Sequence, residues 1–202
     1  MTIRGVYFDF GGVLVRTEDQ SSRARLAGSL GLTSRELEQI VFEGDSSFRA
    51  TVGAITEEQH WLAVAAHLGL PESEMPRLHE EFFRGDLWDR HLFDFLQALR
   101  PAHKVGLISN AWTGLRAVMV EHGFAGSFDA MIISAEVGVA KPDPRIYRLA
   151  LEKLGVAPQE AVFVDDVATN VDGARAVGMH AIRFTRPQPV LDELTALLTN
   201  HR

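Results

Sequence analysis

The sequence contains no cysteine among its 202 residues, which excludes disulfide bonds, thiolate metal sites and cysteine nucleophiles. Basic residues are the minority charge, because 20 Lys and Arg stand against 27 Asp and Glu for a formal net charge of −7. This balance argues against a polyanion-binding surface, so we expect no nucleic-acid partner. No apolar run reaches the roughly 20 residues of a membrane helix, and the N-terminus leads directly into a strand-like run. We therefore expect a cytoplasmic protein with no signal peptide and no membrane association.

Short β-prone apolar runs alternate with helical segments over most of the chain. Continuous apolar strands of this kind are typical of a parallel sheet that is buried on both faces. Hydrophobic residues make up 46% and charged residues 23% of the sequence, which is enough apolar material for such a core. We predict an α/β fold with a Rossmann-like parallel sheet. The expected strands are residues 6–8, 104–108, 131–133, 161–164 and 181–184.

Residues 16–90 have a different pattern. Thr33-Ser34-Arg35-Glu36 and Thr56-Glu57-Glu58-Gln59 both have the form of a capping box, and each precedes apolar residues at helical spacing. No convincing strand is found in this stretch. The sequence thus predicts a core made of residues 1–15 and 91–202, interrupted by a helical insertion at residues 16–90.

Polar side chains follow three of the expected strands. They are Asp9, Ser109 with Asn110, and Asp165 with Asp166. The carboxyl ends of parallel strands meet at one edge of a sheet, and ligands of open α/β sheets bind there. We therefore expect these side chains to converge, although they lie far apart in the chain.

The residue types at this edge favour binding of a metal ion and a phosphate. Asp9 and Asp166 offer the hard oxygen ligands that suit Mg²⁺, and a backbone carbonyl in the Gly11 loop would add a third. Lys141, in a loop stiffened by proline, would neutralise phosphate oxygens and restrain the carboxylates. Ser109, just after a strand, would donate a hydrogen bond to phosphate. A carboxylate beside a bound phosphate is a potential nucleophile.

Each of these residues, taken alone, also has a purely structural interpretation. An aspartate after a buried strand is often a turn residue, adjacent acidic residues often begin a helix, and an isolated lysine is usually solvated. Adjacent glycines often supply only turn geometry. Their joint placement at strand ends, or in the loop beyond one, favours the functional interpretation.

Four segments in this order resemble the four motifs of the haloacid dehalogenase (HAD) superfamily. They are Asp9-Phe10-Gly11-Gly12-Val13-Leu14, Ser109-Asn110, Lys141-Pro142-Asp143, and Val164-Asp165-Asp166 with Asn170. The resemblance spans nearly the whole chain, and the helical insertion lies where the family's C1 cap sits.

The resemblance implies a phosphatase that forms an aspartyl-phosphate on Asp9 and acts on a small phosphorylated metabolite as a monomer or homodimer. The implied catalytic residues are Asp9, Ser109 and Lys141. The implied phosphate-binding residues are Gly11, Gly12, Ser109, Asn110 and Lys141. The implied Mg²⁺ ligands are Asp9, Gly11 through its carbonyl, Asp166, and Asp165, the last either as a ligand or in the outer coordination sphere.

The sequence departs from the family pattern at Gly11. Phosphatases of the superfamily generally carry an aspartate there as general acid and base, and its loss typically costs about 10²- to 10⁴-fold in rate. A glycine at this position resembles the subgroup that includes bacterial glucose-1-phosphate phosphatases, as do Phe42-Glu43-Gly44 and Phe48 in the insertion. A sugar 1-phosphate, whose anomeric leaving oxygen is somewhat more acidic than an ordinary alcohol, fits a weakened acid.

Two alternatives remain open at this point. A 2-haloacid dehalogenase also lacks the second aspartate, and Tyr147 stands six residues after Lys141 as in those enzymes. The adjacent carboxylates Asp165 and Asp166 would, however, repel a carboxylate substrate. The second alternative is a protein that binds a phosphorylated ligand with little turnover. Five residues of the insertion are candidates to face the substrate: Glu18, Arg23, Glu43, Phe48 and Arg49.

Overall fold

The structure is a computed structural model that describes residues 2–200. Its centre is a five-stranded sheet in the order β5-β4-β1-β6-β7, with every neighbouring pair parallel. The central strand β1 pairs Gly5 with Lys104 on one side and with Ala161 on the other. The strands are β1 (Gly5–Phe8), β4 (Lys104–Ser109), β5 (Ala130–Ile133), β6 (Ala161–Asp165) and β7 (His180–Arg183).

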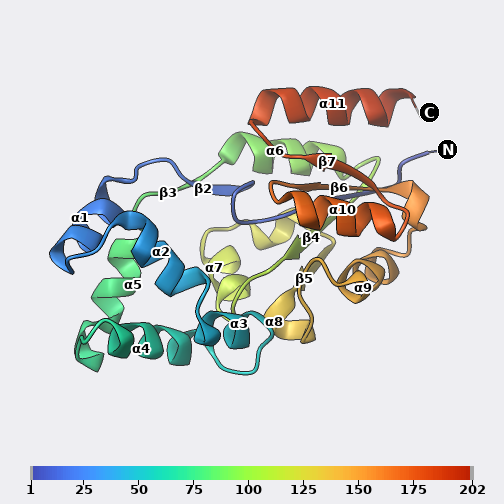
Figure 1. Cartoon of the computed structure of the whole chain (residues 1–202). Helices are drawn as coiled ribbons and strands as arrows, with labels where there is room; N and C mark the ends of the chain where they lie inside the picture. Colours follow the sequence, from blue (N-terminus) through green and yellow to red (C-terminus); the bar gives the residue numbers. More distant parts are fainter. Residues whose placement is uncertain (1, 201–202) are drawn as a thin grey trace.

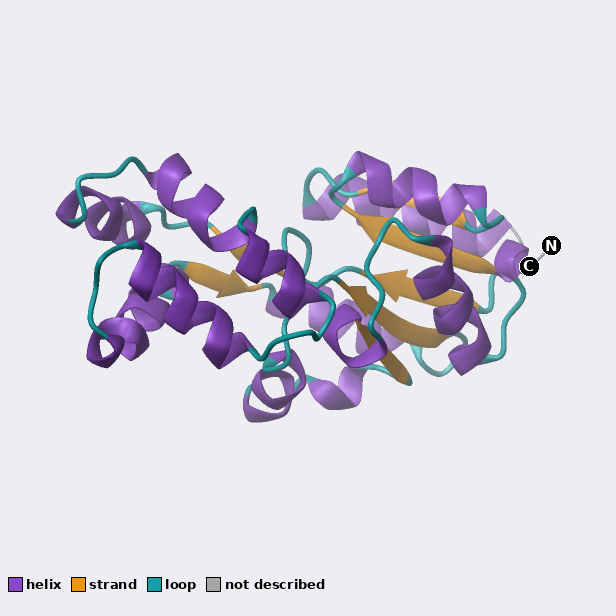
Figure 2. Ribbon diagram, turned by 60° about the horizontal axis from the view of Figure 1, so that its bottom comes forward, coloured by secondary structure: helices purple, strands orange, loops and turns teal. Residues whose placement is uncertain are grey.

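Helices cover both faces of this sheet (Figures 1 and 2). The alternation of a strand sends Val6 and Phe8 into one hydrophobic cluster and Tyr7 into the other. The first cluster is closed by α6 (Arg90–Leu99), α7 (Leu115–Glu121) and α11 (Pro187–Asn200), and the second by α9 (Pro144–Leu154) and α10 (Ala168–Ala176). The α/β fold with a Rossmann-like parallel sheet is confirmed.

A second group of helices lies beyond the carboxyl ends of the strands, away from both chain termini (Figure 2). It consists of α1 (Ser21–Ser29), α2 (Ser34–Phe42), α3 (Asp45–Thr51), α4 (Glu57–His67) and α5 (Met75–Phe83). Both expected capping boxes are formed, on α2 and on α4. The group has its own hydrophobic cluster around Trp61 and Phe82, which are 1% and 0% exposed. We call α1–α5 the helical layer.

The expectation that the insertion holds no strand is wrong. β2 (Val15–Thr17) and β3 (Asp86–Trp88) form an antiparallel ribbon that connects the helical layer to the sheet. Each strand has three residues, too few to show a period of two, and they pair across about 70 positions of sequence. Local pattern therefore carries no signal for this pairing.

Four short helical turns complete the described chain: η1 (Glu72–Glu74), η2 (Ala125–Ser127), α8 (Ser134–Val137) and η3 (Pro158–Glu160). No helix in the described residues is long and apolar enough to cross a membrane.

Candidate active site

Asp9 follows β1 directly and is 7% exposed. Its backbone N–H donates to the Val164 carbonyl at 2.9 Å, which continues the pairing of β1 with β6 by one residue. Carboxylate oxygen Oδ1 accepts from the Phe10 N–H at 2.7 Å and from Lys141 Nζ at 2.8 Å. Within residues 2–200, Oδ2 has no hydrogen-bond donor, so this oxygen is available to a ligand.

Lys141 has its ammonium group fully buried between the two acidic strand ends. Besides Asp9, Nζ donates to Asp165 Oδ2 at 2.7 Å and to the Ile108 carbonyl at 2.9 Å, which occupies all of its N–H groups. Asn110 holds the backbone of Lys141 from both sides, at 2.7 Å and 2.9 Å. The loop that carries the lysine is therefore fixed to the end of β4.

Asp165, the last residue of β6, is completely buried and surrounded by donors. Besides Lys141, it accepts from the Val167 N–H at 2.7 Å and from Asn170 Nδ2 at 3.1 Å and 3.2 Å. Tyr147 donates its hydroxyl proton to the Asn170 carbonyl at 2.8 Å, which fixes that residue in turn. Asp165 therefore holds Lys141 and the start of α10 in place.

Asp166 lies so close to Gly12 that only glycine fits at position 12. A Cβ atom on Gly12 would lie 2.4 Å from Asp166 Oδ2, and Gly12 has a φ of +78°, which disfavours L side chains. Among the described residues no side chain forms a hydrogen bond or ion pair with the Asp166 carboxylate, although Lys141 and Arg183 lie near enough to lower its pKa. Gly11, by contrast, is exposed, and nothing lies within 4 Å of a Cβ placed on it.

The three aspartates carry more charge than Lys141 balances. Carboxylate oxygens of Asp9, Asp165 and Asp166 lie within 4.8 Å of one another. When all are ionised, three carboxylates and one ammonium leave a net charge of −2. Burial raises the pKa of Asp9 to about 7 against the opposing effect of Lys141, and burial and the nearby Asp165 raise the pKa of Asp166. A cluster of hard oxygen ligands with this excess charge fits a divalent cation.

Ser109 ends β4, the strand next to β1, and is 2% exposed. Within the described chain its hydroxyl has no hydrogen-bond partner, so it can bind a ligand oxygen. The structure thus brings Asp9, Lys141, Asp165 and Asp166 into one cluster, with Ser109 on the adjacent strand. Two hydrogen-bonded contacts that support the site have no clear signal in the sequence. They are the bond of Asn110 to the Lys141 backbone and the bond of Tyr147 to the Asn170 carbonyl.

The candidates in the helical layer divide into two kinds. Arg23 is 5% exposed and bonds Glu38 at 2.7 Å and the Phe82 carbonyl at 3.3 Å, so it stabilises the layer from inside and does not face a substrate. Glu18 forms an ion pair with Arg16. Glu43, Phe48 and Arg49 are exposed.

Comparisons with known proteins point to one family. A family model described as hydrolase, haloacid dehalogenase-like hydrolase, matches residues 3–178. The chain is 35% identical to a phosphoserine phosphatase of Thermus thermophilus over 154 residues, which cover 72% of this chain and 61% of that protein. It is 32% identical to bifunctional epoxide hydrolase 2 of Sus scrofa, over 96% of this chain and 38% of that protein. The chain spans between about a fifth and three fifths of the length of the first curated relatives it matches.

Solved structures share the fold. A HAD family enzyme from Bacteroides thetaiotaomicron in complex with magnesium and inorganic phosphate superposes with a TM-score of 0.75 at 20% identity, covering 92% of this chain and 96% of that one. A 2-haloacid dehalogenase from Pseudomonas syringae gives a TM-score of 0.68 at 22% identity, covering 98% and 99%. At these identities the likeness shows the fold alone.

Proposed function

The chain belongs to the haloacid dehalogenase-like hydrolase family, and from that premise we propose that it is a Mg²⁺-dependent phosphomonoester hydrolase that forms an aspartyl-phosphate on Asp9. The observation that carries the proposal is the buried charge cluster. The summed negative charge of the Asp9, Asp165 and Asp166 carboxylates exceeds the single positive charge of Lys141. One carboxylate oxygen of Asp9 is free to react. The magnesium and phosphate bound to a HAD family enzyme of the same fold support this interpretation.

Asp9, Asp166 and the backbone carbonyl of Gly11 are the proposed Mg²⁺ ligands. We assign Asp165 to the outer coordination sphere, because its oxygens already accept from Lys141, Asn170 and the Val167 N–H. When bound, the cation neutralises the carboxylates and withdraws charge from the transferring phosphoryl group.

In the proposed reaction, Asp9 Oδ2 attacks phosphorus in line while the bond from phosphorus to the leaving oxygen breaks. The electron pair of that bond remains on the leaving oxygen, which takes a proton from solvent. The Ser109 hydroxyl donates to a phosphate oxygen, and the Gly12 and Asn110 backbones complete the phosphate site. Esterification removes the negative charge of Asp9, so the Lys141 N–H that bonded Oδ1 can turn to the phosphoryl oxygens. Water then attacks phosphorus, which restores the carboxylate and releases phosphate.

Proton delivery sets the substrate class. Gly11 cannot protonate the leaving oxygen, so the enzyme favours leaving groups more acidic than a simple alcohol. A sugar 1-phosphate meets this requirement, and we propose the glucose-1-phosphate phosphatase subgroup as the nearest functional match. The helical insertion at residues 16–90 is then a C1-type cap over the core formed by residues 1–15 and 91–202, and it excludes bulk water from the intermediate.

A leaving group that needs no proton tests the proposal directly. We expect Mg²⁺-dependent release of p-nitrophenol from p-nitrophenyl phosphate, lost in Asp9→Asn and abolished by EDTA. Chloride release from 2-chloropropionate without metal would instead favour the dehalogenase. A folded protein with neither activity would be a ligand-binding protein. A screen of hexose 1-phosphates against their 6-phosphate isomers then separates substrates by leaving-group acidity.

A further inference from the structure

The chain that follows Ser109 leaves the sheet and enters the helical layer. Trp112 packs into the hydrophobic cluster of that layer, and every other member of the cluster lies between residues 26 and 83. Its ring stacks on Phe42 with centroids 6.0 Å apart and lies 4.4 Å from the ring of His60. Trp61 contacts it edge-on at 5.9 Å. A side chain three positions from the proposed phosphate-binding hydroxyl is therefore part of the core of the layer.

The next two residues bind the first residue of α4. The Glu57 N–H donates to Thr113 Oγ1 at 3.1 Å, and Gly114 donates its N–H to Glu57 Oε2 at 3.0 Å. Gly114 is the N-cap of α7, so α4 and α7 satisfy each other's free N–H groups at their first turns. His79 Nε2 lies 3.4 Å from the second oxygen of Glu57 and orients the carboxylate from behind.

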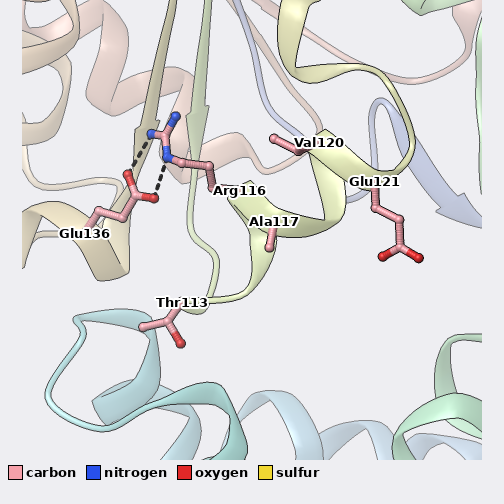
Figure 3. A pocket seen from close by; sticks show the side chains of 6 residues that line it. All are labelled: Thr113, Arg116, Ala117, Val120, Glu121 and Glu136. Atoms are coloured by element: carbon pink, nitrogen blue, oxygen red, sulfur yellow. Dashed lines mark hydrogen bonds and ion pairs between the residues drawn. The ribbon is translucent and has the colours of Figure 1, made fainter.

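The core and the helical layer approach closely at two glycines, and the approach requires glycine at Gly53, where the neighbour is backbone. A Cβ on Gly114 would lie 2.2 Å from Glu57 Oε2. A Cβ on Gly53 would lie 2.1 Å from the Ala135 carbonyl, and Gly53 has a φ of +71°. Beside this contact an open hollow of about 590 Å³ lies along α7, lined by residues from Thr113 to Glu136, and the Thr113 side chain points toward the helical layer (Figure 3). The loop 110–114 and Ala135 thus both lie in close contact with the helical layer.

We propose that Trp112 and Glu57 are positioning residues that fix the cap and the phosphate-binding end of β4 as one unit. The inference rests on the proposed function of Ser109 and Lys141. Asn110 connects the same loop to the Lys141 backbone at 2.7 Å, so a displacement of the loop moves the lysine as well. Cap position and the geometry around Asp9 are therefore set together, through the loop 110–114.

The test compares truncating with conservative variants on p-nitrophenyl phosphate. Trp112→Ala and Glu57→Ala are expected to lower kcat/KM about 10- to 100-fold, the loss that a displacement of about 1 Å produces, with most of it in kcat. Trp112→Phe and Glu57→Gln, which keep a ring and an acceptor oxygen, are expected to remain within about threefold of wild type. The Trp112→Ala/Glu57→Ala double variant is expected to lose little more than the worse single variant, because both residues fix the same loop.

Leu78→Ala is the matched control, because Leu78 is 2% exposed in the same cluster and, among the described residues, no hydrogen bond or ring contact joins its side chain to the loop. It should be destabilised yet retain kcat/KM when assayed below its melting temperature. An equal loss in Leu78→Ala, wild-type kcat/KM in folded Trp112→Ala, or additive losses in the double variant would each overturn the proposal.

Fluorescence keeps this inference separable from the proposed function. In a Trp61→Phe/Trp88→Phe background Trp112 is the sole tryptophan. Adding Glu57→Ala should make acrylamide quench it more strongly, whereas adding Glu57→Gln should not. Unchanged quenching in Glu57→Ala would refute the proposal that Glu57 fixes the loop around Trp112. This holds even if the protein is inactive or if Trp112→Ala fails to fold. A wild-type chain that hydrolyses no phosphoester refutes the proposed function alone.

Discussion

Replacing Gly11 with aspartate is expected to supply the general acid that the site lacks. The backbone permits the change, because Gly11 is exposed, has no left-handed φ, and has nothing within 4 Å of an added Cβ. The neighbouring position is the opposite case, since a side chain on Gly12 would overlap Asp166 at 2.4 Å. The substitution therefore adds a carboxyl group beside the nucleophile without displacing the cluster.

The expected gain depends on the leaving group. A positioned acid contributes about 10²- to 10⁴-fold, or about 2.7 to 5.4 kcal/mol of transition-state stabilisation, when the leaving oxygen needs a proton. For p-nitrophenolate, which leaves without one, the same principle predicts almost no gain. The diagnostic quantity is therefore the ratio of kcat/KM on an alkyl phosphate to kcat/KM on p-nitrophenyl phosphate.

Steady-state kinetics on both substrates at saturating Mg²⁺ measure this ratio, with Gly11→Asn as the control of equal shape and no acid. The ratio should rise in Gly11→Asp and stay at the wild-type value in Gly11→Asn. If Gly11→Asp raises only the affinity for Mg²⁺, or changes nothing, the account of a missing proton donor is refuted.

The remaining predictions concern the charge cluster. Lys141→Ala leaves Asp9 and Asp165 buried without their cation and should lower the free energy of unfolding by about 3 to 5 kcal/mol, measured by urea denaturation without metal. Burial raises the pKa of Asp9 to about 7, so the native state keeps a proton that the unfolded chain releases at lower pH. The free energy of unfolding of the metal-free protein should therefore fall as pH rises from about 4 through 7. Asp9→Asn should flatten that dependence of stability on pH. The Mg²⁺ affinity of the wild type, measured by calorimetry, should weaken as pH falls through 7, because protons compete with the metal for Asp9. Gly12→Ala should abolish turnover while leaving far-UV circular dichroism unchanged; wild-type turnover would contradict the contact with Asp166.

The strands and the residues at their ends were predictable because both depend on local pattern. A run such as Ala161–Asp165 is continuous in apolar residues until its final aspartate, and parallel pairing then dictates where Asp9 and Asp165 meet. The capping boxes of α2 and α4 were recognisable for the same reason, since each is made within four residues.

Contacts between distant segments were not predictable. The β2–β3 ribbon pairs residues about 70 positions apart, and nothing local in Leu87 or Trp88 indicates a partner. The hydrogen bonds of Asn110 to Lys141 and the packing of Trp112 in the helical layer depend on tertiary approach, as does the burial of Arg23. The domain boundaries, the catalytic assignments and the oligomeric state remain predictions.

The ribbon has a consequence for how the protein can be rebuilt. Thr17 faces Asp86 across the two strands, so the chain departs from and returns to the α/β core at neighbouring points. Residues 18–85 therefore leave and rejoin the core at one place and contribute no strand to the parallel sheet. A grafted layer would keep the charge cluster only if it also receives Trp112 and replaces the contacts of Glu57 with Thr113 and Gly114.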